Sequence, residues 1–346
     1  MVKIQQNRSG NGGGNYFVRD ILNERHRGRM AEQPIHRDVR LVEWITQQRD
    51  SVQSELLKHG AILFRDFTVK SVDEFERVIV AISGNDSWVQ YREAATPRSH
   101  VSGHIFTSTE YSAKNRIYLH NENSHVTTWP GKLFFYCQTA PQKDGETPLA
   151  DVRKVFGRIS PDIRERFTQK GWRYTRTFGF GLGFTWQVVF SAKTKEEVNN
   201  YCQQNYMTPE WLGPDRLRVG YRRWAALAHP QTKEMVWFNH GMFYNLFTLE
   251  PGLKTVVRSM GEDKMPYNTS YGDGSRIEIE VLEALDAAYS DETVRFSWKS
   301  GDVLIVDNML TAHGRQPFEG KREVFVGMTD LIRCEDIAPR DSFLTS

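Results

Sequence analysis

The sequence predicts a mainly β protein with peripheral helices, in which the strands form an antiparallel sandwich or barrel. Many short segments are rich in β-branched and aromatic residues and are bounded by Gly, Pro or Asp, as strands usually are. Few of these segments alternate with helices in the way that a doubly wound parallel sheet requires. With 346 residues, 39% of them hydrophobic, the chain can bury a large core.

Two helices and a short strand are expected ahead of the strand-rich part. Apolar positions recur at helical spacing over residues 38–59, and Gly60 follows as a stop signal. The apolar run 61–67 is predicted to be a short buried strand. Ser71 and Glu74 then have the spacing of a capping box, which predicts that a second helix opens there.

Strands dominate the prediction from residue 116 onward. The expected strands are 116–122, 132–138, 147–151, 172–178, 234–240, 294–298, 302–307 and 322–328. Three further helices are expected to interrupt them. Their predicted starts are Ser160 with Pro161 at the first helical position, Thr194 with Glu197, and Ser275 with Glu278.

Charge and cysteine content exclude several classes of function. The formal net charge is +2, from 45 basic and 43 acidic residues, so nothing indicates nucleic acid or an anionic membrane as a partner. The three cysteines are far apart and form no CxxC pair, which argues against a thiolate zinc site or a disulfide framework. No apolar run of about 18 residues occurs. We therefore expect a soluble protein of a reducing cytoplasm.

A candidate metal site begins at the end of the expected strand 116–122. His120 and Glu122 are two residues apart, and side chains at that spacing point to the same face of a strand. His313, which follows the apolar strand 302–307, is the best candidate for a third ligand. Two histidines and one carboxylate on one face of an ion leave three coordination positions open, which is the arrangement of non-haem iron(II) oxygenases.

The His-x-acid spacing alone is a weak signal. It recurs at His36 and Asp38, where it precedes a helix and no strand aims the side chains. A short motif needs its structural context, and only the pair at 120 and 122 has a strand before it. We therefore do not expect His36 to bind a metal.

Five segments resemble the taurine-dioxygenase-like superfamily, and within it the HxE branch that includes clavaminate-synthase-like and peptide-antibiotic tailoring oxygenases. These segments are TPRSHVSGHIFTSTEY (96–111), IYLHNENSH (117–125), DGETPLADVRKVF (144–156), HPQTKEMVWFNH (229–240) and GDVLIVDNMLTAHGRQPFEGKREVFVGM (301–328). The resemblance covers roughly residues 90–330. It implies a distorted double-stranded β-helix, that is, a jelly-roll or cupin-like fold. The expected organisation is a flexible N-terminal arm over 1–35 and a single catalytic domain over 36–346, with an insertion at about 172–246.

The resemblance implies the cofactors Fe(II), 2-oxoglutarate and O2, with His120, Glu122 and His313 as the metal ligands. The distal carboxylate of 2-oxoglutarate needs a cationic partner, and the planar guanidinium of arginine binds a carboxylate with two hydrogen bonds. Arg322 matches the family position, on the expected strand 322–328. Arg315 is the rival, in an expected turn that would fix it less well.

A hydroxyl and three substrate groups complete the implied site. Thr147 matches the family threonine that helps to hold the same carboxylate, although it could also be an ordinary strand threonine. Arg98, Trp237 and Asn239 lie in segments typical of this branch and are candidates for substrate binding. A tryptophan in a strand is, however, more often a core residue. His125 and His240 are expected nearby without being ligands.

The resemblance thus implies an oxidoreductase, a 2-oxoglutarate-dependent dioxygenase that hydroxylates an unactivated C–H bond and releases succinate and CO2. The substrate would be an amino acid or a derivative, free or bound to a carrier protein, in natural-product biosynthesis. Desaturation, cyclisation or epoxidation would use the same residues and stay open. Two other interpretations also stay open: a non-catalytic metal- or carboxylate-binding β-helix protein, and a cupin-like enzyme that uses another metal without an oxo acid. Neither the substrate nor the oligomeric state follows from the sequence.

Overall fold

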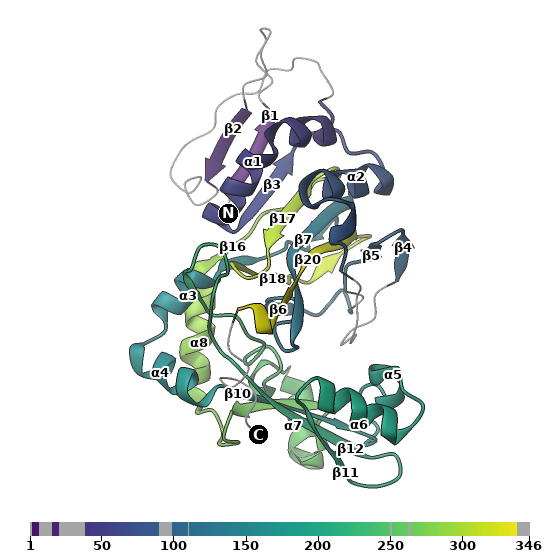
Figure 1. Cartoon of the computed structure of the whole chain (residues 1–346), viewed down its shortest axis with the longest axis vertical. Coiled ribbons are helices and arrows are strands. Elements are labelled where there is room, and N and C mark those ends of the chain that lie inside the picture. The colour runs from purple at the N-terminus through teal and green to yellow at the C-terminus, as the bar shows by residue number, and fades with distance from the viewer. Residues whose placement is uncertain are drawn as a thin grey trace.

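The computed structural model describes residues 2–6, 16–20, 39–89, 99–109, 111–249, 251–261 and 264–337. They form a mainly β molecule with helices on its outside (Figure 1). Among the described helices, none combines the length and the apolar character needed to cross a membrane. Of the arm expected over 1–35, only two strands are described, and the rest of it lies outside the described residues, as does His36.

The largest sheet has eight strands and dominates the upper half of Figure 1. Strands β1 and β3 are parallel, and the other neighbours in this sheet are antiparallel. In spatial order the strands are β2 (Tyr16–Asp20), β1 (Val2–Gln6), β3 (Ala61–Arg65), β17 (Val303–Asp307), β7 (Thr128–Thr139), β20 (Glu323–Arg333), β5 (Ile105–Thr107) and β4 (His100–Ser102).

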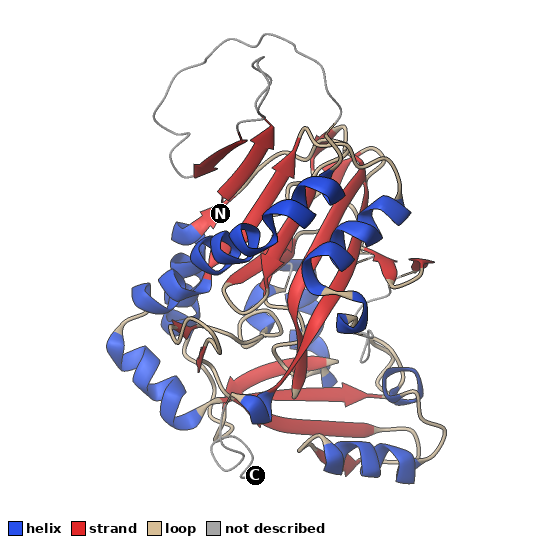
Figure 2. Ribbon diagram, turned by 45° about the horizontal axis from the view of Figure 1, so that its top comes forward, coloured by secondary structure: helices blue, strands red, loops and turns tan. Residues whose placement is uncertain are grey.

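Two helices, α1 (Leu41–His59) and α2 (Val72–Ser83), cover one face of this sheet (Figure 2). The alternation of side chains along β3 shows how the sheet divides its two faces. Ile62 and Phe64 pack with the helices, whereas Leu63 belongs to a separate cluster on the opposite face. Both faces of β3 are therefore buried, as expected for an apolar run without polar alternation.

The ends of both helices follow from local sequence. α1 ends at Gly60, which adopts a left-handed φ of 73° and donates its N–H to the carbonyl of Leu56. Ser71 caps α2 by accepting the N–H of Glu74 at 3.2 Å. The Glu74 carboxylate accepts the N–H of Lys70 instead of that of Ser71, so only half of the predicted capping box forms.

A second sheet packs against the helix-free face of the large one. Leu63, Phe135 and Val326 from the large sheet meet Leu149 and Trp298 in a shared core. The four antiparallel strands of this second sheet are, in order, β16 (Thr293–Val294), β9 (Leu149–Asp151), β18 (Thr311–Arg315) and β6 (Ile117–His120). Two small two-stranded sheets are also present, β8 (Lys143–Asp144) with β19 (Phe318–Glu319) and β13 (Leu227–Ala228) with β14 (Met235–Val236).

A third sheet forms the lower part of Figure 1. Three of its strands come from the segment predicted as an insertion over 172–246, and the fourth comes from beyond it. Its strands are β11 (Thr208–Trp211), β12 (Leu217–Arg223), β10 (Trp172–Phe178) and β15 (Tyr267–Tyr271), near α5 (Trp186–Phe190), α6 (Lys195–Gln204) and α7 (Pro251–Met260). The other helices are α3 (Val152–Arg158), α4 (Pro161–Lys170) and α8 (Ile279–Glu292), with short 3-10 turns η2 (Asn85–Ser87), η3 (Leu246–Thr248) and η5 (Cys334–Asp336).

Two of the three later helix starts are confirmed. α4 has Pro161 in its first turn, and α6 opens with a complete capping box between Thr194 and Glu197. The third prediction is wrong, because the helix begins at Ile279. The hydroxyl of Ser275 donates to Asp273 at 2.5 Å, within a turn, and therefore does not cap a helix.

The strand predictions were least accurate where the backbone hydrogen-bonds to groups outside the sheets. Only two residues of the expected strand 234–240 pair as a strand, and the N–H of Trp237 donates to Val152 in a loop contact. Of 294–298, only the first residue pairs. Strands β12, β15 and β18 were not predicted, and the last of these carries His313.

Candidate metal centre and co-substrate pocket

Sheet pairing brings the two candidate histidines together. β18 and β6 are antiparallel, with His313 directly opposite His120. The two ring centroids are 4.5 Å apart, and both side chains are buried. Nδ1 of His120 lies 2.8 Å from the carbonyl oxygen of Tyr118, which can only accept, so Nδ1 carries the proton. Nε2 of His120 therefore keeps its lone pair for a metal.

Glu122 completes the cluster from a turn. β6 ends at His120, and Asn123 takes a left-handed φ of 57°, so the expectation that residues 116–122 form one strand is wrong at its end. The Glu122 carboxylate nevertheless approaches His313, with Oε2 4.0 Å from Nε2. One ligand atom from each of these three residues lies within 4.8 Å of the others, and all three side chains are buried.

This donor set fits a divalent metal ion. An ion about 2.1 Å from each ligand atom holds them at most about 4.2 Å apart, so a small movement of the side chains would bring all three onto it. Two neutral imidazoles and one carboxylate suit a borderline ion such as Fe(II) and offset one of its charges. Three positions of an octahedron would be left for other ligands.

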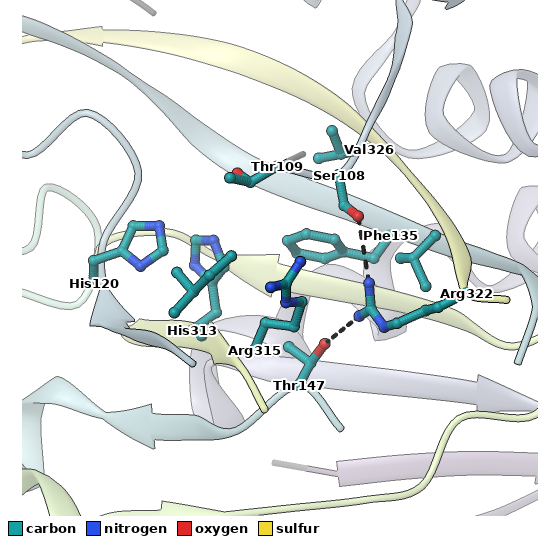
Figure 3. A pocket seen from close by; sticks show the side chains of 12 residues that line it. Ser108, Thr109, His120, Phe135, Thr147, His313, Arg315, Arg322 and Val326 are labelled. Carbon is teal, nitrogen blue, oxygen red and sulfur yellow. Dashed lines mark hydrogen bonds between the residues drawn. The ribbon is translucent and has the colours of Figure 1, made fainter. Parts of the chain in front are cut away.

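A pocket extends from the two histidines to Arg322 (Figure 3). It has about 420 Å³ of empty space, part of it open to solvent. Apolar side chains of Phe135, Val324 and Val326 form much of its wall. The Phe135 ring also packs on His313, with centroids 5.4 Å apart, so one side chain borders both the candidate metal site and the pocket.

Arg322 lies at the far end of this pocket. It immediately precedes β20, and its guanidinium donates to the Gly145 carbonyl at 3.1 Å and more weakly to the hydroxyls of Ser108 and Thr147, at 3.4 and 3.5 Å. Within the described chain it forms no ion pair with an acid. Burial lowers the pKa of Arg322 to about 10, so it remains cationic at neutral pH. A half-buried cation that pairs with no carboxylate among the described residues is a good receptor for an anionic ligand.

Thr147 has the hydrogen-bonding capacity to assist Arg322. Its buried hydroxyl oxygen accepts the indole N–H of Trp298 at 3.1 Å and an N–H of Arg322. A hydroxyl has two lone pairs and one hydrogen. Because both acceptor positions face N–H donors, the hydrogen is left to donate to a ligand in the pocket.

Arg315 also lines the pocket, but its guanidinium is used within the protein. It donates to the carbonyls of Tyr111, Ser112 and Asn115 at 2.9, 2.6 and 3.0 Å, so it fixes the loop before β6. The expectation that Arg315 lies in a turn is wrong, because it is the last residue of β18. Its neighbour Gly314 has no room for a side chain, since a Cβ there would lie 2.6 Å from the Ile117 carbonyl.

The three substrate candidates have different positions. Arg98 lies outside the described residues. Trp237 is buried in the core, where its ring meets Phe167 edge-on at 5.3 Å. Asn239 donates to the Ala225 carbonyl at 2.7 Å and accepts the N–H of Gly241 at 2.9 Å. Neither Trp237 nor Asn239 borders the pocket of Figure 3, and a substrate role for any of the three stays a prediction.

His125 and His240 lie beside the metal cluster without joining it. The His240 ring is 5.5 Å from that of His120 and 4.8 Å from that of His125, and Nδ1 of His240 lies 2.5 Å from the hydroxyl of Ser124. Burial lowers the pKa of His125 to about 3, so it is neutral at physiological pH. Neutral, ring-packed histidines are consistent with the expectation that these two are neighbours only.

Sequence reasoning missed several residues that build the site. Phe135 could have been found, because alternation along the expected strand 132–138 places it on one face with Leu133 and Cys137. Ser108 gave no such signal, and neither did the hydrogen bond of Trp298 to Thr147, because a single polar contact between distant segments leaves no periodic pattern.

Comparisons with known proteins agree with this picture. The profile of the family described as "Taurine catabolism dioxygenase TauD, TfdA family" matches residues 28–329. The dapdiamide synthesis protein DdaC of Enterobacter agglomerans is 38% identical over 278 residues, which is 80% of this chain and 84% of DdaC. A clavaminate synthase-like protein of Arabidopsis thaliana is 28% identical over 298 residues, which is 82% and 86% of the two chains.

A solved structure shares the fold. PvcB from Pseudomonas aeruginosa superposes with a TM-score of 0.52 at 13% identity, over 87% of this chain and 86% of PvcB. A second structure of PvcB, described as an Fe, alpha-ketoglutarate dependent oxygenase from an isonitrile synthetic pathway, gives a TM-score of 0.51 at 14% identity, over 87% and 86%. At this identity the likeness concerns the fold alone.

Proposed function

We propose that this chain, which belongs to the taurine catabolism dioxygenase TauD, TfdA family, hydroxylates an unactivated C–H bond of an amino acid or an amino-acid-derived compound. It is a dioxygenase that uses Fe(II) and 2-oxoglutarate. One observation carries the proposal. A single pocket has a candidate metal-binding cluster at one end and, at the other, an arginine that pairs with no acid among the described residues, which suits a small dicarboxylate that chelates a metal.

The proposal assigns a role to each residue of the pocket. His120, Glu122 and His313 would hold Fe(II), and Arg322 with Thr147 would hold the distal carboxylate of 2-oxoglutarate. Fe(II) with 2-oxoglutarate supplies the oxidising chemistry, in which one atom of O2 enters the product and the other enters succinate as CO2 leaves. The apolar wall of Phe135, Val324 and Val326 would keep bulk water from the co-substrate and strengthen its ionic contacts.

We also propose a finer description of the architecture. The large sheet and the β16-β9-β18-β6 sheet would be the two walls of a distorted double-stranded β-helix, because their shared core encloses the pocket. Residues 36–346 would then be one catalytic domain. The third sheet would be largely the insertion over 172–246, completed by β15.

The substrate class rests on the relatives. The 38% identity to a dapdiamide synthesis protein and the likeness to a clavaminate synthase-like protein support specialised metabolism and an amino-acid-derived substrate. Such a substrate could be free or tethered to a carrier protein, and Arg98, Trp237 and Asn239 are the proposed contacts. We place the enzyme in the cytoplasm, where thiols stay reduced, because its three cysteines are buried and form no disulfide.

Anaerobic spectroscopy tests the proposed function. We expect Fe(II) and 2-oxoglutarate together to give a weak visible charge-transfer band, and admission of air to release succinate. Zn(II), which has no redox chemistry, should bind without either signal. A protein that gives no band and no succinate would instead be a non-catalytic binder. Screening free and carrier-bound amino acids for faster succinate release would then identify the substrate class.

Replacing Thr147 by valine tests whether its hydroxyl helps to hold 2-oxoglutarate. We expect the 2-oxoglutarate concentration for half-maximal succinate release to rise about 10- to 100-fold, because a hydrogen bond to a charged group contributes about 1.5–3 kcal/mol. Thr147→Ser is the matched control, since it keeps the hydroxyl, and it should stay close to wild type. Equal requirements for 2-oxoglutarate in both variants would mean that Thr147 has only a structural role.

A further inference from the structure

Glu122 is the one candidate ligand that no strand holds. His120 and His313 are fixed by sheet pairing, because they face each other across β6 and β18. Glu122 lies beyond the end of β6, in the interior, where its backbone N–H and carbonyl have no strand partner. Buried peptide groups must be hydrogen-bonded, and any freedom in this turn would move the carboxylate away from the histidines.

The side chain of Asn308 satisfies both backbone groups of Glu122. Its Oδ1 accepts the Glu122 N–H at 2.7 Å, and its Nδ2 donates to the Glu122 carbonyl at 2.9 Å. This two-point contact reproduces what a neighbouring strand would give. The second hydrogen of Nδ2 goes to the Pro130 carbonyl at 2.8 Å, so both amide hydrogens are used.

Asn308 is itself held rigidly. It is fully buried, and its own N–H donates to the Gly131 carbonyl at 2.9 Å. Its carbonyl accepts the side-chain amide of Asn121, also fully buried, at 2.7 Å. Asn308 thus makes five hydrogen bonds, three with residues 121–122 and two with residues 130–131 of β7. The first three join the turn after β6 to the turn between β17 and β18, and the other two tie that turn to β7.

The same turn leads directly to His313. Asp307 shapes it by accepting the N–H groups of Met309 and Leu310 at 3.0 and 3.1 Å. Its other carboxylate oxygen lies 3.4 Å from Nε2 of the buried His229. The turn at 307–310 therefore fixes the Glu122 backbone through Asn308 and opens β18, which carries the opposite ligand.

We propose that Asn308 is a positioning residue that aims the Glu122 carboxylate at the metal. The inference rests on the proposed function, because it assumes that Glu122 binds Fe(II). Asparagine is suited to the task, since only an amide offers an acceptor and two donors in this geometry. Aspartate is nearly the same size, but it would place a carboxylate oxygen against the carbonyls of Glu122 and Pro130 and would break both contacts.

Measuring the metal affinity of the Asn308→Asp variant tests the proposal without relying on catalysis. Anaerobic titration with Fe(II), and with Co(II) for its visible d–d spectrum, should show binding about 10- to 100-fold weaker than in wild type, the usual cost of losing a group that orients a ligand. The Co(II) spectrum should also change shape, because the carboxylate would no longer sit at its proper position. A loss of stability alone would not change that spectrum once Co(II) saturates the site.

Asn245→Asp is the matched control. Asn245 is a buried asparagine that also bonds backbone, donating to Thr269 at 3.2 Å and accepting the N–H of Phe247 at 2.8 Å, far along the chain from the ligands. We expect it to lower the melting temperature without changing metal affinity or the Co(II) spectrum. Asn308→Asp with wild-type affinity and spectrum would overturn the proposal.

Asn121→Ala keeps the proposal testable if Asn308→Asp does not fold. It removes only the 2.7 Å bond to the Asn308 carbonyl, and we expect metal binding a few-fold weaker. Unchanged affinity in this variant would count against the positioning role. If wild-type protein bound neither Fe(II) nor Co(II), the proposed function itself would fail, which is a different outcome from equal binding by wild type and variants.

Discussion

Replacing Glu122 or His313 by alanine is expected to abolish turnover while the fold stays intact. Each variant leaves two of the three ligands, so Fe(II) would bind weakly and in the wrong geometry. We expect succinate release to fall at least about a thousand-fold, on the order of 4 kcal/mol in the barrier. The effect on folding should be small or favourable, because Glu122 and the histidines are buried polar groups, and removing one of them removes part of the desolvation cost of the cluster.

Two measurements separate loss of the ligand from loss of the fold. Circular dichroism and thermal unfolding of both variants should match the metal-free wild type. Glu319→Ala serves as a control, since Glu319 is exposed and pairs only with Lys143 at 3.0 Å among the described residues, and it should keep full activity. Substantial turnover in either ligand variant would refute the assignment of the metal site.

Arg322→Ala is expected to raise the requirement for 2-oxoglutarate more than any other pocket variant. Removing one partner of a buried ion pair costs about 3–5 kcal/mol, which corresponds to about a hundred- to a few thousand-fold in affinity. The rate at saturating 2-oxoglutarate should fall much less, because the metal ligands are untouched. Succinate release measured over a range of 2-oxoglutarate concentrations gives both quantities.

Arg315→Ala is the comparison that decides between the two arginines. Because Arg315 donates to three backbone carbonyls, its loss should lower thermal stability and leave the 2-oxoglutarate requirement within a few-fold of wild type. If Arg322→Ala left that requirement unchanged and Arg315→Ala raised it, Arg315 would be the carboxylate partner.

The metal cluster could be proposed from sequence because it needs only residue types and order. His120 and Glu122 follow an apolar strand, and His313 lies in a segment that resembles the family motif. The reason given for their convergence was partly wrong, since Glu122 is in a turn and the pairing of β18 with β6 could not be foreseen. The sequence of β18 is Thr-Ala-His-Gly-Arg, which has no alternation of apolar and polar residues, so no pattern predicted a strand there.

Hydrogen bonds between side chains and distant segments of the chain could not be predicted from the sequence. Asparagine is common in turns, and nothing in the sequence around Asn308 indicated that its amide bonds Glu122, 186 residues away. The polar contact of Trp298 with Thr147 spans 151 residues and has no periodic signature either. Periodicity reports which face of an element is buried, whereas these contacts depend on how distant turns meet.

The crowding along β18 constrains how this protein can diversify in evolution. All five of its residues are buried, His313 is a candidate ligand, and neither Gly314 nor the facing Gly60 has space for a methyl group, since a Cβ at Gly60 would lie 2.3 Å from the Thr311 hydroxyl. Very few substitutions in such a strand would be tolerated. We therefore expect new substrate preferences to arise in segments outside this sheet, such as the third sheet.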